Sequence, residues 1–373
     1  MVRTYRYILF DLVVIFLFFV TINANSANVH ITTALKVGYD DNITFKHSQK
    51  EKSFFSDTSL GFEVNDNSSI HKLMFDINIT QRIFSNTPDF NNIFEFCGLS
   101  YSREFFDKDR VALSETFIHA EEPRSFSDFF GRRAERYSFF LNEFNISYDS
   151  SICKRLRLYT GYSLGTYNAD SSSVKDSIIH IFEIGPTLFI GGKENIFLHY
   201  RFGFTDFNGA SDAKIHSAIL GFSSYLKRAL SVNLKIGADY ITDFADDSYI
   251  KPTYSISFIY FIDKTAQTAV TFSKAFSTTY YTNDIFDQWK VAIYADRQID
   301  RYTRVFISGF YGNGRYVSFG IKDNLAGVGV ALEHEITGNW LGRFSYEYSL
   351  THSNKINREY EKNFISIGLS RKF

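Results

Sequence analysis

Alternation of apolar and polar residues, repeated from about residue 28 almost to the last residue, constrains this chain more than any other feature. It is clear over residues 73–83, 230–240 and 340–350, where nearly every second residue is apolar and those between are mostly polar or charged. A period of two predicts β-strands with one apolar face, not amphipathic helices. Each run is about ten to thirteen residues long, which exceeds most strands of soluble proteins.

Short polar turns, such as those at 263–265 and 337–339, alternate with longer connections, such as those at 40–51, 120–135 and 278–285. The turns recur about every 35 to 44 residues, which fits one hairpin per interval. We therefore predict about 18 strands, with 16 as the nearest alternative. A β-propeller would need four short strands per repeat, and a periplasmic β-sandwich seldom needs so many even strands.

The first 27 residues have the pattern of a secretory signal peptide. Arg3 and Arg6 precede an apolar stretch at 12–22, and small residues follow, with cleavage expected after Ala24 or Ala27. An inner-membrane anchor is the alternative, but the stretch is far shorter than the roughly 20 residues that a spanning helix needs. We expect residues 1–27 to be removed and residues 28–373 to form one domain.

No run of 18 apolar residues occurs beyond residue 28, so a mature chain in a membrane can cross it only with strands. Since hydrocarbon offers no hydrogen-bond partners, such a sheet must close on itself. The predicted fold is all-β, a transmembrane antiparallel up-and-down β-barrel in the bacterial outer membrane, reached through the periplasm. Its expected surroundings are outer-membrane lipid and lipopolysaccharide.

The last strand ends at Phe373, which is typical of the signal that the barrel-insertion machinery reads. Arg371 stands two positions before the end, where an aromatic residue is more usual. We expect the insertion machinery to be a partner of this strand.

An Arg or Lys side chain placed at lipid depth costs roughly 2–4 kcal/mol, so the faces that carry charged residues of both signs are predicted to point inward. These charged residues line a conducting pore or form ion pairs that fill the lumen, and the width expected for 16 to 18 strands favours the pore. The predicted pore-lining residues are Lys72, Asp76, Arg82, Glu143, Arg155, Arg157, Glu183, Arg201, Lys235, Asp239, Lys251, Lys290, Asp296, Arg343 and Glu347. Over 93–102, 111–119 and 304–311 both faces contain polar and apolar residues, so the sequence does not decide which face points inward there.

The long connection at 120–135 carries both signs of charge and three phenylalanines. One hypothesis is that it folds inward as a constriction; the alternative is an exposed surface loop. The residues that would set selectivity are Glu121, Glu122, Arg124, Arg132 and Arg133.

Other chemistry is weakly indicated. The net charge of -1 argues against nucleic-acid binding. We expect no metal, no cofactor and no catalytic residue: Asp40, Asp41 and Asn42 are too few to hold calcium and suit a turn or strand end, and no GxSxG motif supports an outer-membrane hydrolase. Cys97 and Cys153 are the only cysteines; they could pair after export, but two unpaired residues on separate strands is the preferred interpretation.

Three short segments, at 37–43 (VGYDDNI), 120–125 (AEEPRS) and 226–231 (LKRALS), resemble the β-barrel porin 2 family of outer-membrane proteins. The resemblance implies an outer-membrane barrel, and some members of that family look linked to exopolysaccharide export. The expected function is a porin-like channel for passive passage of small hydrophilic solutes or saccharides. The alternative is a non-conducting structural or adhesive barrel.

Overall fold

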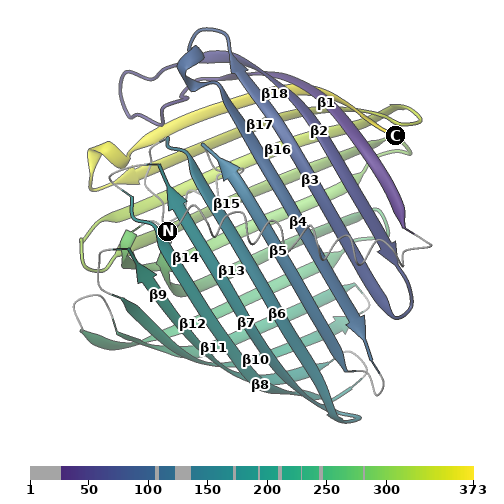
Figure 1. The fold of residues 1–373 in the computed structure, drawn as a ribbon, viewed down its shortest axis with the longest axis vertical. Coiled ribbons are helices and arrows are strands. Elements are labelled where there is room, and N and C mark those ends of the chain that lie inside the picture. The colour runs from purple at the N-terminus through teal and green to yellow at the C-terminus, as the bar shows by residue number, and fades with distance from the viewer. Residues whose placement is uncertain are drawn as a thin grey trace.

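A single closed sheet makes up the described part of the chain. The computed structural model describes residues 27–105, 109–121, 136–170, 174–191, 194–208, 212–227, 229–242, 247–279 and 282–373. These residues form one 18-stranded antiparallel sheet in which strands adjacent in sequence pair, and β18 pairs with β1 to close the barrel (Figure 1). The predicted fold class and the strand number of 18 are confirmed.

The strands are β1 (Asn28–Asp40), β2 (Ser53–Asn67), β3 (His71–Phe84), β4 (Asn92–Glu104), β5 (Arg110–Ala120), β6 (Phe139–Cys153), β7 (Leu156–Ala169), β8 (Ser177–Phe189), β9 (Asn195–Phe207), β10 (Ala213–Lys227), β11 (Leu230–Thr242), β12 (Ser248–Phe261), β13 (Ala266–Thr279), β14 (Thr282–Gln298), β15 (Thr303–Tyr316), β16 (Lys322–Thr337), β17 (Trp340–Ser353) and β18 (Tyr360–Lys372). Two short 3-10 turns, η1 (Pro88–Phe90) and η4 (Ile356–Arg358), lie in the connections β3–β4 and β17–β18.

The alternating pattern gives each strand an outward apolar face. At the closing seam, Leu35 and Val37 of β1 pair with Leu369 and Ile367 of β18, and all four side chains are exposed on the outside. Their sequence neighbours, such as Lys36, point inward. The register carries this assignment from strand to strand around the barrel, because directly opposite residues share a face.

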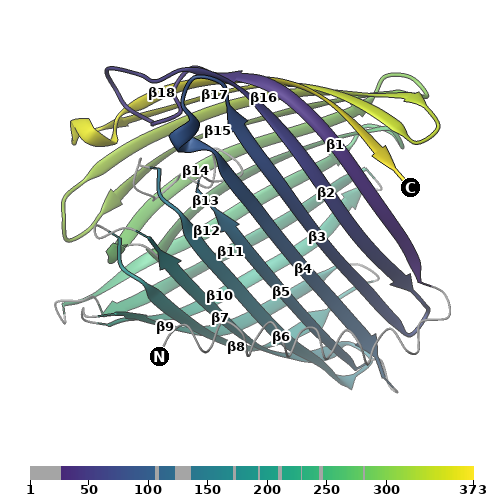
Figure 2. The ribbon, with the colours of Figure 1, turned by 45° about the horizontal axis from the view of Figure 1, so that its top comes forward.

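The two ends of the barrel differ. Short connections join the strands at the end where β1 begins and β18 ends, and the longer ones lie at the other end (Figure 2). Side-chain hydrogen bonds fix the short turns: the Asp263 carboxylate accepts from the backbone N–H of Thr265 at 2.6 Å, and that of Asp300 from the N–H of Tyr302 at 2.8 Å. Gly338, in the β16–β17 turn, has a φ of +49°, which favours glycine.

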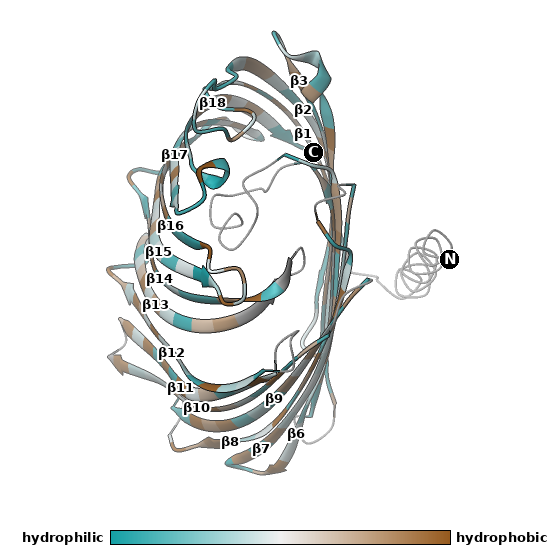
Figure 3. Ribbon diagram, turned by 90° about the vertical axis from the view of Figure 1, so that its left-hand side faces the viewer, coloured by the Kyte–Doolittle hydropathy of each residue, from teal (hydrophilic) through white to brown (hydrophobic). Residues whose placement is uncertain are grey.

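One predicted loop is wrong. The segment 278–285 was expected to be a connection, yet the β13–β14 pairing continues to Thr279 and Thr282. Here the ladder between β12 and β13 stops at Tyr254 and Lys274, so the far part of the β13–β14 hairpin leaves the wall. Figure 3, which looks into the long-connection end, shows this hairpin curving into the barrel.

Several of the buried apolar clusters lie inside the barrel near the long-connection end. One contains Phe45, Leu325 and Tyr360, and another contains Ile43, Phe55 and Phe84. Figure 3 also shows that the wall of β2–β6 runs nearly straight, whereas β10–β17 curve around the other side. No helix among the residues described is long and apolar enough to cross a membrane.

Candidate pore lumen

Fourteen of the fifteen residues predicted to line the pore lie on the inward face of their strands. The assignment follows from register: Lys36, Asp57 and Arg82 lie opposite one another on β1, β2 and β3, and their neighbours Leu35 and Ile83 are exposed outside. The fourteen are Lys72, Asp76, Arg82, Glu143, Arg157, Glu183, Arg201, Lys235, Asp239, Lys251, Lys290, Asp296, Arg343 and Glu347.

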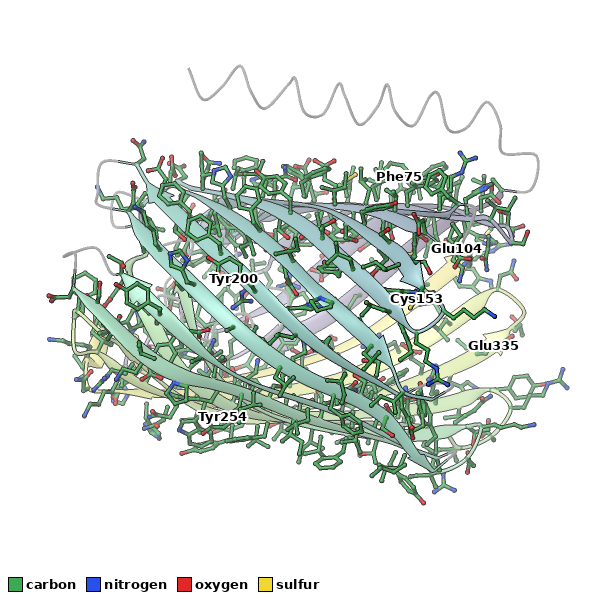
Figure 4. The ribbon with its side chains drawn as sticks, turned by 90° about the horizontal axis from the view of Figure 1, so that it is seen from below. Phe75, Glu104, Cys153, Tyr200, Tyr254 and Glu335 are labelled. Carbon is green, nitrogen blue, oxygen red and sulfur yellow. The ribbon has the colours of Figure 1, made fainter. Side chains whose placement is uncertain are left out.

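The placement of Arg155 needs correction. The β6 strand ends at Cys153 and β7 begins at Leu156, so Arg155 lies in the exposed turn between them and not on a strand face. Figure 4 shows Cys153, Glu104 and Glu335 together at this short-connection end of the barrel. Arg155 is only two residues from Arg157, so alternation assigns both side chains to the same face. Only the position of the turn shows that Arg157 lies on a strand and Arg155 does not.

A belt of charged side chains of both signs crosses the lumenal face from β15 through β18 and β1 to β3. Directly paired residues give the order Arg304, Glu333, Arg343, Gly368, Lys36, Asp57 and Arg82. Arg343 Nη1 lies 2.8 Å from Glu333 Oε1, and Arg304 also pairs with Asp296. Opposite charges on neighbouring strands stabilise the sheet and keep the charges hydrated or paired inside the barrel.

Asp57 is the centre of the tightest part of this belt. Its side chain is 1% exposed and accepts two hydrogen bonds from Arg82, at 2.8 and 2.9 Å, while Lys36 Nζ lies 2.7 Å from Oδ2. Two stacked rings support the cations: Phe55 and Phe364 are 5.0 Å apart, and the Arg82 guanidinium lies 4.5 Å from the Phe55 ring centroid. This arrangement holds both cations toward the lumen.

A cavity of about 450 Å³ opens beside this group. Its wall includes four cations and three carboxylates, together with small hydroxyl and amide side chains. The charged residues are Lys36, Arg82, Arg343, Lys362, Asp57, Glu121 and Glu347. Such a polar, hydrated space suits a small hydrophilic solute and offers groups for ions of either sign.

The β1–β2 connection bounds the cavity at its long-connection end. Asn42 is fully buried; its amide donates to the carbonyls of Lys46, at 2.8 Å, and Glu361, at 2.9 Å. Lys362 pairs with Asp40 at 2.7 Å and lies 4.1 Å from the centroid of the Phe45 ring. The segment around Asp40 and Asn42 is thus a structural strand end, as its sequence predicts, but it also folds Phe45 into the lumen, which sequence reasoning missed.

The β13–β14 hairpin is a second inward element that sequence reasoning missed. Phe276 and Ile285 are buried against Ile215 and Ile241, whose strand faces line the lumen on β10 and β11. The residues of the hairpin that continue the outward apolar face therefore cover the inside of the wall. Alternation gives no signal for this, because an apolar face reads the same whether lipid or protein covers it.

The other side of the hairpin meets a buried ion pair. Phe286 packs on Tyr316 with centroids 4.8 Å apart, and the Arg358 guanidinium lies 5.1 Å from the Tyr316 ring. Arg358 Nη2 is 2.5 Å from Asp323 Oδ2, and both side chains are less than a tenth exposed. The hairpin is thereby held between the β10–β11 wall and the β17–β18 connection.

A second arc of charged residues lies across β8–β12. Glu183 and Arg201 are directly opposite, as are Asp239 and Lys251. His199 approaches Glu183 at 2.6 Å and stacks on Tyr159 with centroids 5.2 Å apart. The lumen therefore carries both signs of charge on both sides.

Of the predicted constriction residues, the structure describes only Glu121. Its carboxylate pairs with Arg136 at 3.2 Å and lines the cavity. Glu122, Arg124, Arg132 and Arg133 lie outside the described residues, so the constriction hypothesis for 120–135 stays a prediction.

Within the described ranges, no group of three or more His, Cys, Asp or Glu side chains could hold a metal ion. Cys97, on the outward face of β4, and Cys153, at the end of β6, are both free thiols. The two cysteines belong to separate strands, and the interpretation that they stay unpaired after export stays a prediction.

The fold defines the class: this is a closed 18-stranded antiparallel β-barrel, a fold that outer-membrane porins also have. The chain is similar to the crystal structure of Pseudomonas aeruginosa OccK2 (OpdF), with a TM-score of 0.50, 9% identity, and coverage of 93% of this chain and 98% of that chain. It also aligns with P. aeruginosa OpdQ, at a TM-score of 0.49 and 10% identity over 93% of this chain and 97% of the other.

A third similar structure is Acinetobacter baumannii OccAB4, at a TM-score of 0.48 and 9% identity, covering 94% of this chain and 100% of that chain. No family model matches this chain, and no curated protein matches its sequence. At 9% identity, the similarity to OccK2 establishes the fold alone. Membership of the family that the sequence motifs resemble stays a prediction.

Proposed function

We propose that the mature chain is an outer-membrane channel for passive passage of small hydrophilic solutes or saccharides. The observation that carries the proposal is the cavity of about 450 Å³, lined by charges of both signs inside a closed barrel. A lumen built only for packing would bury apolar side chains there. Hydrated Lys36 and Arg343, with side chains 36% and 56% exposed, instead leave a wet surface.

The outside of the barrel supports the membrane location. Large apolar side chains are exposed on strand after strand, including Leu198, Ile236 and Ile367. In Figure 4, Tyr254, which is 39% exposed, projects from the outer surface. Such a surface is stable only in lipid, so we propose the bacterial outer membrane, with lipopolysaccharide around the long-connection end.

The same proposal includes how the chain arrives. Residues 1–27 act as the export signal, and the strand ending at Phe373 is read by the barrel-insertion machinery. The β18 strand pairs with β1 over nine residue pairs, from Thr32–Lys372 to Asp40–Phe364, so its insertion also closes the barrel. A role in exopolysaccharide passage is the narrower form of the proposal and follows from the sequence motifs alone.

Uptake of sugars into liposomes tests the proposal. Vesicles containing the refolded chain should swell in monosaccharide solutions, and the rate should fall steeply for larger oligosaccharides because the cavity is small. Vesicles without protein are the control. Vesicles that hold folded, heat-modifiable barrels and still fail to swell with any solute would contradict it.

A non-conducting structural barrel is the second candidate. The buried clusters around Phe45 and Phe276, near the long-connection end, favour it, because they fill part of the lumen. The two candidates separate when the β13–β14 hairpin is released. A channel conducts before and after release, whereas a plugged barrel begins to conduct only afterwards.

A further inference from the structure

A stripe of polar side chains faces outward from β4, β5 and β6. It consists of Glu95, Cys97, Glu115, His119 and Asn142 and is called here the polar stripe. Its outward direction follows from register, since Leu99 and Phe144 lie directly opposite Glu115, and the inward neighbours Ile118 and Leu141 pack in a lumenal cluster. In contrast, the outward face of β11 is apolar throughout, from Leu230 to Tyr240.

Glu115 lies at the centre of β5, five residues from each end of an 11-residue strand. That position is near the middle of the hydrocarbon layer. An ionisable side chain there is costly in lipid and finds no partner among acyl chains. The polar stripe therefore requires another protein surface against this wall.

The hydrogen bonding of the stripe is incomplete within one copy. The amide of Asn142, on β6, lies within hydrogen-bonding reach of the Glu115 carboxylate. Among the residues that the structure describes, Asn142 Oδ1 itself has no hydrogen-bond partner. His119 Nδ1 lies 3.1 Å from Glu95, so the stripe contains carboxylate acceptors beside hydrogen-bond donors. A surface that carries both donors and acceptors can pair with a second copy of the same surface.

We infer that β4–β6 form an interface with a second copy of this chain. A two-fold axis along the membrane normal keeps both barrels in the same orientation and brings the Asn142 amide of one copy, whose second N–H can donate, to the Glu115 carboxylate of the other. The nearly straight course of β2–β6 in Figure 3 allows two such walls to meet over several strands. Polar groups at membrane interfaces join proteins in this way, in an otherwise apolar contact.

Cys97 provides a built-in probe, because it lies outward on β4, beside Glu115. In a Cys153→Ser chain reconstituted in bilayers, oxidation or a short bifunctional maleimide should link two copies through Cys97. In the same background, Glu115→Leu with Asn142→Leu should weaken the linked dimer by about tenfold, from the loss of two symmetry-related hydrogen bonds. As a matched control, a chain lacking both cysteines but carrying Ile307→Cys, on the outward face of β15, should remain monomeric.

Folding is checked by heat-modifiable migration, so loss of the dimer is not mistaken for loss of the barrel. The inference is overturned if Cys97 reacts fully with a lipid-soluble maleimide while no dimer forms. It is also overturned if the double leucine variant dimerises as well as its parent. Because solute passage is measured per barrel, either result leaves the proposed channel standing.

Discussion

Replacing Asp57 by asparagine removes one negative charge from the lumenal cavity and preserves the shape of the side chain. In the native chain this carboxylate faces Lys36 and Arg82 at 2.7 to 2.9 Å. The variant leaves both cations without their closest counter-charge. The cavity should therefore become more attractive to anions and less attractive to cations.

The size of the effect follows from the geometry. A cavity of about 450 Å³ corresponds to a sphere of about 5 Å radius, so an ion in it lies about 5 Å from its wall. One unit charge at that distance in water is worth about 0.8 kcal/mol, or roughly a fourfold change in occupancy. Since anions gain and cations lose by about fourfold each, the permeability ratio should shift roughly fifteenfold toward anions at low salt, and less at high salt.

Reversal potentials across a planar bilayer in a salt gradient measure this ratio. Glu63→Gln is the matched control: Glu63 is also a lumenal carboxylate of β2, paired with Lys372 at 3.4 Å, but it does not line the cavity. The reasoning is refuted if Asp57→Asn conducts normally with native selectivity, because ions would then bypass the cavity.

Three further predictions concern parts of the barrel outside that cavity. Phe276→Ala removes the ring that anchors the inward hairpin on Ile215 and Ile241, so larger and noisier conductance steps are expected, whereas Ile250→Ala, on the exposed outer face, should change neither. Asp323→Asn leaves the buried Arg358 without its ion-pair partner and should destabilise the long-connection end by about 3–5 kcal/mol, seen as earlier proteolysis there. Hydrogen bonds from the backbone of Tyr302 and from Thr303 hold the pKa of Asp300 below its usual 3.8. The stability from this turn is present above that value and lost as pH falls through the lowered pKa; urea unfolding of Asp300→Asn should lack this acid-side loss, and an identical acid response in both chains would speak against it.

Much of this fold could be predicted from the sequence because lipid and water impose alternation directly. The period of two located the strands, and the turns at 263–265 and 337–339 lie where the polar residues indicate. The faces of Arg82, Lys235 and Glu347 follow from the same alternation. The stretch at 111–119 is mixed because Glu115 and His119 face outward there.

What the sequence could not reveal is the inward folding at the long-connection end. Phe276 and Ile285 continue an outward apolar pattern, and only the end of the β12–β13 ladder shows that protein covers them instead of lipid. Phe45 likewise is one of two apolar residues in a polar loop, and its burial depends on Tyr360, more than 300 residues away. Contacts between segments so far apart have no local signature.

Single-channel recording of the mature chain in planar bilayers tests the central claim most directly. A closed barrel with a wet, charged lumen predicts discrete, stable conductance steps from each inserted molecule. Folded barrels that insert and remain silent across voltages and salts would contradict it.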